Sequence, residues 1–81
     1  MPMSAPNPVD PVTAEITARL AAPHFKPFVI HQSDGLVIPV PSREHCLVTR
    51  LLRRIEVETD DFRIYFISPL HVTKIEDLPA A

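Results

Sequence analysis

The spacing of hydrophobic residues changes along the chain, from a helical period near the start to a period of two later on. Val12, Ile16 and Leu20 recur every four residues, which places their side chains on one face of a helix. An aspartate followed by a proline precedes this stripe, as is common at helix starts, and Pro23 disfavours helical geometry just before it. The pattern predicts a short amphipathic helix at about 11–22.

From residue 28 onward, short apolar runs are separated by turn-forming residues, which is typical of antiparallel strands. Asp34-Gly35 between two apolar runs is a strong hairpin signal. Prolines in the run after this turn cannot donate to a ladder, so that strand is expected at an edge or a bend. The strands are expected at 28–32, 36–41, 45–49, 54–59, 62–67 and 71–75. A short helical turn fits residues 42–45 as well.

The apolar run at 62–67 follows a tight turn marked by two aspartates. Its alternate residues Phe62, Ile64 and Phe66 are expected to point into the core. If this strand lies at a sheet edge, its unpaired backbone groups must be covered or paired. Either another element of the chain or a second chain is therefore expected beside it.

One helix followed by short antiparallel strands predicts a mainly β fold with one N-terminal helix. The sheet is expected to be small, strongly bent and antiparallel, or to form a partly open barrel. The 81 residues suffice for one domain, which we place at 10–77. Residues 1–9 contain three prolines and predict a flexible arm, and residues 78–81 predict a C-terminal tail.

A domain of this size buries only about 60% of its unfolded surface, so a disulfide, a metal or a partner often adds stability. Cys46 is the only cysteine, which excludes an internal disulfide and favours a homo-oligomer or a partner protein.

The formal charge of −2 gives no general attraction to nucleic acid or to anionic membranes. Short apolar runs, the lack of a signal-peptide pattern and the unpaired cysteine predict a cytoplasmic protein without a membrane-spanning segment.

Four motifs occur in a characteristic order along the chain. They are Pro27-Phe28, Asp34-Gly35, Pro41-Ser42-Arg43-Glu44-His45 and Leu70-His71-Val72-Thr73-Lys74-Ile75-Glu76. Through them the chain resembles, over about residues 12–77, a diffuse set of small uncharacterised bacterial proteins with an N-terminal helix and a small bent β-sheet. This resemblance implies a fold and no activity.

More loosely, residues 28–35 and 62–75 resemble the first strand and the final strand pair of the Sm-like architecture, which includes bacterial RNA chaperones. That resemblance implies an oligomeric ring in which the edge strand pairs with the neighbouring subunit, and RNA as a partner. The family's Asp-x-apolar-x-Asn signature is replaced here by Ser42-Arg43-Glu44-His45, so only the architecture, a small Sm-like or SH3-like bent sheet, is carried over.

Arginines cluster around the loop that precedes the strand at 54–59. The candidate RNA-binding residues are Arg43, Arg50, Arg53 and Arg54. Several such donors on one surface can bind phosphates, and Lys74 would add to them. The alternative interpretation is a solvated loop whose arginines pair with nearby carboxylates. Those carboxylates are Glu56, Glu58, Asp60 and Asp61.

No residue pattern indicates catalysis or a bound cofactor. His24, His31, His45, His71 and Cys46 lack the short ligand spacings that zinc sites commonly have. A lone cysteine in a strand-like run is typical of a small buried hydrophobe, and a chain with one glycine has no glycine-rich phosphate loop. We therefore expect no enzyme, no cofactor and no metal site.

These observations favour a non-catalytic binding or assembly module that pairs through an edge strand with itself or with a partner protein. The residues expected on its partner-binding surface are Arg63, Tyr65, Ile67, His71 and Lys74. The alternative is an Sm-like oligomeric protein that binds RNA through the arginine cluster, with an affinity that falls steeply with salt.

Overall fold

The computed structural model describes residues 10–49 and 54–79, which contain one α-helix, six strands and two short 3-10 helices. The helix α1 spans Pro11–Ala21. The strands are β1 Phe28–Gln32, β2 Val37–Val40, β3 Cys46–Thr49, β4 Arg54–Glu58, β5 Ile64–Ile67 and β6 Val72–Asp77. The 3-10 helices are η1 Arg43–His45 and η2 Pro69–His71. The arm predicted at 1–9, Arg50, Arg53 and residues 80–81 lie outside the described residues.

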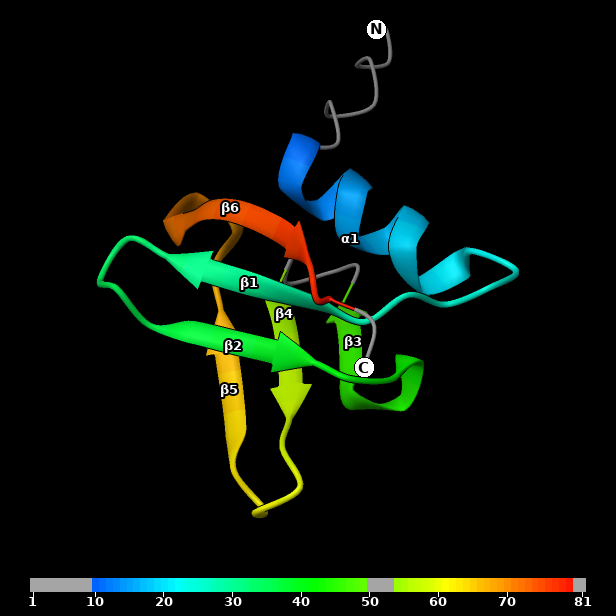
Figure 1. Ribbon diagram of the computed structural model, residues 1–81. Coiled ribbons are helices and arrows are strands. Elements are labelled where there is room, and N and C mark those ends of the chain that lie inside the picture. The colour runs from blue at the N-terminus through cyan, green and yellow to red at the C-terminus, as the bar shows by residue number, and fades with distance from the viewer. Residues whose placement is uncertain (1–9, 50–53, 80–81) are drawn as a thin grey trace, which may run out of the picture.

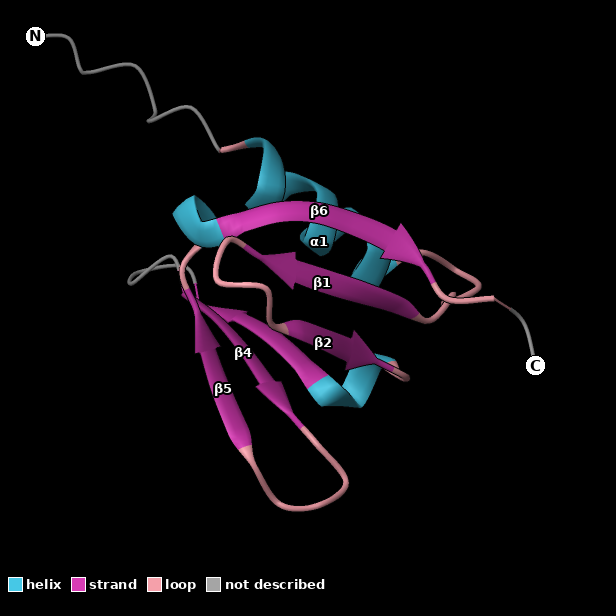
Figure 2. Ribbon diagram, turned by 60° about the vertical axis from the view of Figure 1, so that its left-hand side comes forward, coloured by secondary structure: helices cyan, strands magenta, loops and turns pink. Residues whose placement is uncertain are grey.

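Within the described part of the chain, the strands form two three-stranded antiparallel sheets, with orders β2-β1-β6 and β3-β4-β5. The strands of one sheet run across those of the other (Figure 1), and α1 lies beside β6 in both ribbon views (Figure 2). The mainly β fold with one helix is confirmed, but the two sheets do not close into a barrel. The chain passes from one sheet to the other at the two 3-10 helices, because η1 lies between β2 and β3 and η2 lies between β5 and β6.

Helix α1 begins where the sequence predicts it and ends one residue earlier. Asp10 is the N-cap, and its carboxylate accepts hydrogen bonds from the Thr13 N–H at 2.8 Å and from the Thr13 hydroxyl at 2.7 Å. The apolar stripe faces the core, with Ile16 fully buried and Val12 and Leu20 packed beside it. Since a helix this short is marginal by itself, its stability comes from this packing.

The predicted Asp-Gly hairpin joins β1 to β2. The Gly35 N–H donates to the Gln32 carbonyl at 3.0 Å, and the Asp34 carboxylate accepts from the Leu36 N–H at 2.9 Å. Gly35 has a φ of 90°, a conformation that glycine adopts without the steric cost other residues meet. The turn signal in the sequence is therefore confirmed.

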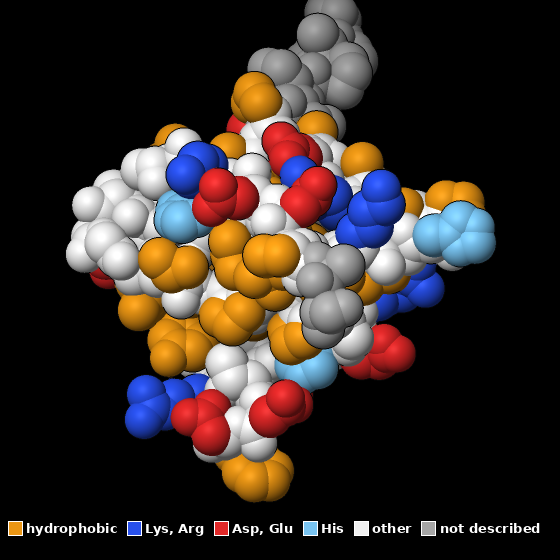
Figure 3. Space-filling view, in the orientation of Figure 1, with side chains coloured by type: hydrophobic (Ala, Val, Ile, Leu, Met, Phe, Trp, Pro, Cys, Tyr) orange, Lys and Arg blue, Asp and Glu red, His pale blue; other side chains and the backbone are white. Residues whose placement is uncertain are grey.

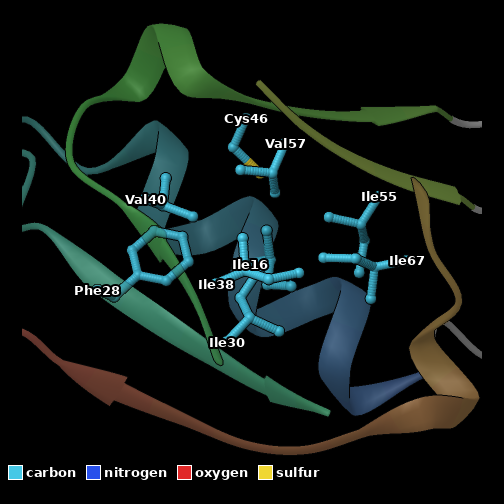
Figure 4. Packing of buried hydrophobic residues seen from close by; sticks show 9 residues of the cluster. All are labelled: Ile16, Phe28, Ile30, Ile38, Val40, Cys46, Ile55, Val57 and Ile67. Carbon is cyan, nitrogen blue, oxygen red and sulfur yellow. The ribbon is translucent and has the colours of Figure 1, made fainter. Parts of the chain in front are cut away.

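The core lies between the two sheets and α1. Ile16 from the helix points toward apolar side chains of both sheets (Figure 4). The buried cluster is made of Ile16, Phe28, Ile30, Ile38, Val40, Cys46, Ile55, Val57 and Ile67. One strand contributes to this core through residues that the sequence pattern did not indicate, namely β5.

The inward and outward faces predicted for β5 are reversed in the structure. Ile67, expected to point outward, is 1% exposed, and Tyr65 packs against the core. Ile64 and Phe66, expected to point inward, are 57% and 59% exposed. The prediction for this strand is therefore wrong.

The cause is the length of the loop between β4 and β5. The Thr59 N–H donates to the Arg63 carbonyl at 2.9 Å, so the loop has three residues, 60–62, where a turn of two aspartates was expected. Its last residue, Phe62, has a φ of 65°, as in the common three-residue hairpin loop that ends in a left-handed residue. One extra loop residue shifts the register by one and moves every β5 side chain to the opposite face.

Candidate interaction surface

The three most exposed large apolar side chains of the described residues lie in β5 or within three residues of it. Phe62, just before it, is 97% exposed, and Leu70, just after it in η2, is 91% exposed. With Ile64 and Phe66 these residues define what we call the β5 surface. Figure 3 shows hydrophobic side chains at the tip of the β4–β5 hairpin as well as across the middle of the visible face. Four large apolar side chains exposed within nine residues of sequence are unusual for a solvated strand and its flanks.

The outer face of the β3-β4-β5 sheet continues this surface with a mixture of charged and apolar side chains. Glu56 of β4 lies between Leu47 of β3 and Phe66 of β5, as their cross-strand pairing requires. The Arg54 guanidinium lies over the Phe66 ring, 5.5 Å from its centroid. Leu47 is itself exposed. The apolar groups of this face are therefore bordered by charges of both signs.

The backbone of β5 has one unpaired edge among the described strands, because β5 pairs with β4 alone. Hydrogen-bonded pairs alternate along an antiparallel ladder. The Thr59–Arg63 pair is hydrogen-bonded, so every second residue after Arg63 is hydrogen-bonded to β4 as well. Tyr65 and Ile67 therefore direct their N–H and C=O groups toward β4. The N–H and C=O groups of Ile64 and Phe66 therefore point to the open edge.

The other sheet edges that the structure describes have features that discourage pairing. In β2 the same alternation, starting from the hydrogen-bonded Gln32–Leu36 pair, directs the backbone of Pro39 to the open side. Proline has no N–H group, so this edge lacks a donor there. β6 carries several charged side chains, and its Asp77 is bound to Arg19 of α1 at 2.5 Å. β3 contacts α1. By contrast, β5 contains no proline and no charged residue.

The residues predicted to bind a partner do not form one surface. Arg63 is exposed and forms an ion pair with Asp61 at 3.2 Å, beside the β4–β5 loop. Tyr65 is half-buried and Ile67 is buried, because both face the core. The other two predicted residues, His71 and Lys74, are exposed but belong to η2 and to β6 of the other sheet.

Two of the predicted RNA-binding arginines have partners within the fold. The Arg43 guanidinium donates to the carbonyls of Leu20 and Ala22 at 2.8 and 2.6 Å, and these are carbonyls that the end of α1 leaves unpaired. It also lies 5.7 Å from the centre of the Phe25 ring. Arg54 stacks on Phe66 as described above. Arg43 therefore closes the helix C-terminus, a role that sequence spacing did not indicate.

Sequence reasoning also missed a chain of three polar side chains. The Ser42 hydroxyl lies 2.7 Å from Nδ1 of His45, and Nε2 of His45 lies 2.9 Å from Asp60. The Ser-x-x-His spacing was the only local signal for it. A serine, a histidine and a carboxylate in series can activate the hydroxyl when the carboxylate is buried, but Asp60 is exposed. The chain of bonds instead ties η1 to the β4–β5 loop.

Cys46 is buried, and this burial raises the pKa of its thiol to about 11. The thiolate, which is the reactive form, is thus disfavoured at neutral pH. Over residues 10–49 and 54–79, no group of three or more His, Cys, Asp or Glu side chains is placed to hold a metal ion. In the same residues, no helix is long and apolar enough to cross a bilayer.

Comparison with protein-family models, with curated proteins and with solved structures gives no match for this chain. The resemblances noted from the sequence therefore stay predictions.

Proposed function

We propose that this chain is a non-catalytic binding and assembly module that associates, through the open edge of β5, with itself or with a partner protein. The observation that carries the proposal is the coincidence of two features on one strand. Ile64 and Phe66 expose apolar side chains, and the same two residues direct their backbone N–H and C=O groups to the open edge. A strand added there gains hydrogen bonds and apolar contacts together.

The finer fold assignment, an Sm-like or SH3-like domain, belongs to the same proposal. An N-terminal helix and a last strand that returns to pair with the first support it. The corresponding alternative function, RNA binding, has less support. Arg43 already donates to two helix carbonyls, and Lys74 lies 3.5 Å from Glu76. Phosphate contacts at either residue would compete with these bonds.

Site-specific photo-crosslinking tests the proposal even when the partner is unidentified. A benzophenone amino acid replaces Phe66, the protein is irradiated in its native cell, and adducts are identified by mass spectrometry. The matched control carries the same group at Val37, an exposed apolar residue on the β2 edge that contains Pro39. We expect a discrete protein adduct from position 66 and none from position 37. No protein adduct at position 66, or equal labelling at both positions, would overturn the proposal.

A further inference from the structure

We propose that the occupant of the β5 edge is a second copy of this chain, paired antiparallel to β5 about a two-fold axis that passes at Tyr65. This inference rests on the proposed function and names its partner. It gives a continuous six-stranded sheet, with one β3-β4-β5 sheet from each copy.

The positions of the free backbone groups select this register. Ile64 and Phe66 are the β5 residues whose N–H and C=O groups are open, so they are the ones that can exchange hydrogen bonds with another strand. With the axis at Tyr65, Ile64 stands opposite Phe66 of the second copy, and Phe66 stands opposite Ile64 of that copy. Every open group of both strands then has a partner. A shift by two residues along the strand leaves half of them unpaired.

The side chains match in the same register. Each Ile64 meets a Phe66, and an aromatic residue opposite a β-branched one is a favourable cross-strand pair. Arg63, the charged residue nearest to β5, stands opposite Ile67 of the second copy and not opposite its own counterpart. The pairing therefore brings apolar groups together without setting like charges against each other.

The two exposed residues that flank β5 are accounted for as well. Phe62 lies before the strand and Leu70 lies after it, and nothing in the described part of the chain covers them. Antiparallel pairing sets the start of one β5 beside the end of the other. Phe62 thereby comes next to the segment that carries Leu70 of the second copy, and the whole β5 surface gains an apolar neighbour.

The distribution of charge favours the same arrangement. On β4, Arg54 lies at the end of the sheet near Ile67, whereas Glu58 lies at the hairpin end, next to Asp60 and Asp61. The two-fold pairing brings Arg54 of one copy toward the hairpin end of the other copy, where the three carboxylates outnumber the one arginine, Arg63. Pairing with β6 of another copy would instead place charged Lys74 and Glu76 beside the apolar strand.

Two cysteine variants test the register, both made in a Cys46→Ala background so that no other thiol is present. Tyr65→Cys stands on the axis, where opposing Cα atoms of a pair without hydrogen bonds are about 4.5 Å apart, within disulfide range. The control, Arg63→Cys, lies two residues from the axis and roughly 14 Å from its counterpart. We expect mild oxidation to link two chains through position 65 and not through position 63. Equal linkage at both, or linkage at 63 alone, would overturn the register.

A second pair of variants tests the edge itself, in case Tyr65→Cys does not fold. Ile64→Pro removes a donor on the open side only, and Ile64→Val keeps it. Each hydrogen bond changes the dissociation constant by up to about a factor of ten. Because the dimer is two-fold symmetric, the Ile64→Pro substitution removes two such bonds from each dimer. We therefore expect the proline to raise the dimer dissociation constant roughly tenfold or more, and valine to change it little. A dimer as tight with proline as with valine would contradict the inference.

The molar mass of the unaltered chain, measured by light scattering over a range of concentrations, separates this inference from the proposed function. Twice the chain mass of 9.1 kDa is expected. A higher mass points to ring pairing and overturns the two-fold dimer. A single-chain mass at every concentration also overturns it, but a protein adduct at position 66 would still support the edge as the binding site of a different protein.

Discussion

Val57 of β4 lies directly opposite Tyr65 of β5, and two residues further along Ile55 lies opposite Ile67. Cross-strand partners share a face of the sheet, so burial of Val57 and Ile55 brings Tyr65 and Ile67 toward the core. The same register turns Ile64 and Phe66 outward. The exposure of the β5 surface is thus a direct consequence of how β4 and β5 are paired.

Alanine substitutions on the two faces of β5 test this register. Ile67→Ala removes fully buried methyl groups and is expected to lower the free energy of unfolding by about 2–4 kcal/mol. Ile64→Ala, on the exposed face, is expected to lower it by less than about 1 kcal/mol. Urea titration at a concentration where the chain is monomeric measures both. A larger loss for Ile64→Ala than for Ile67→Ala would mean that the faces are the reverse of those described.

The loop that sets the register ends in Phe62, whose backbone has an unusual left-handed conformation. Phe62 holds a positive φ while its side chain is almost fully exposed, so a glycine there relieves strain and loses few contacts. We expect Phe62→Gly to raise the free energy of unfolding of the monomer by about 0.5–1 kcal/mol, and Phe62→Val to lower it. Thermal or urea unfolding decides the sign, and a destabilised glycine variant would contradict the left-handed loop conformation.

Acid should weaken the contact between β6 and α1. The hydrogen bond from Arg19, together with the charge of that guanidinium, lowers the pKa of Asp77 from its ordinary 3.8. The folded pKa is below the unfolded one, so this contribution to stability is present above pH 3.8 and is lost as pH falls through the lower folded value. In the Asp77→Asn variant, the free energy of unfolding should depend less on pH in that acid range.

Arg19→Gln serves as the matched variant for this pair, because it removes the positively charged guanidinium and leaves the Asp77 carboxylate in place. In a double-mutant cycle, urea unfolding at several pH values measures the free energy of unfolding of each variant. The two substitutions together should reduce its pH dependence in the acid range no more than either substitution alone. Fully additive effects would show that Arg19 does not act on Asp77.

Cys46 should react slowly in the folded chain. Burial raises the pKa of its thiol to about 11, against an ordinary value of 9.0, so the thiolate fraction is lower by roughly two orders of magnitude at mildly alkaline pH. We expect a thiol reagent at about pH 8 to label the native protein at least ~100-fold more slowly than the urea-unfolded chain. Equal rates in both states would mean that Cys46 is accessible and that β3 is not packed as described.

Local signals in the sequence were sufficient for the first half of the fold. The Asp-Pro pair and the stripe at Ile16 define the start and the buried face of α1, and Asp34-Gly35 defines the hairpin. Each of these features depends on neighbours within a few residues. Short-range physics therefore determines them, and the structure confirms them.

The faces of β5 could not be obtained in this way. Whether Phe62 belongs to the loop or to the strand depends on its left-handed backbone, which is uncommon for a bulky residue and has no sequence mark. The Arg43 contact with the end of α1 and the His45–Asp60 bond join residues 15 or more positions apart. Such contacts depend on tertiary structure. Misplacing one loop residue was enough to move the predicted binding face to the wrong side of the strand.

Amide hydrogen exchange at β5, followed residue by residue by NMR, is the most direct test that the open edge of this strand is the association surface. The N–H groups of Tyr65 and Ile67 face β4 and should be protected at every concentration. The N–H groups of Ile64 and Phe66 should become equally protected in the assembled state and lose that protection first on dilution. Rapid exchange of Ile64 and Phe66 in a state whose mass shows assembly would contradict the account, because association would then use another surface.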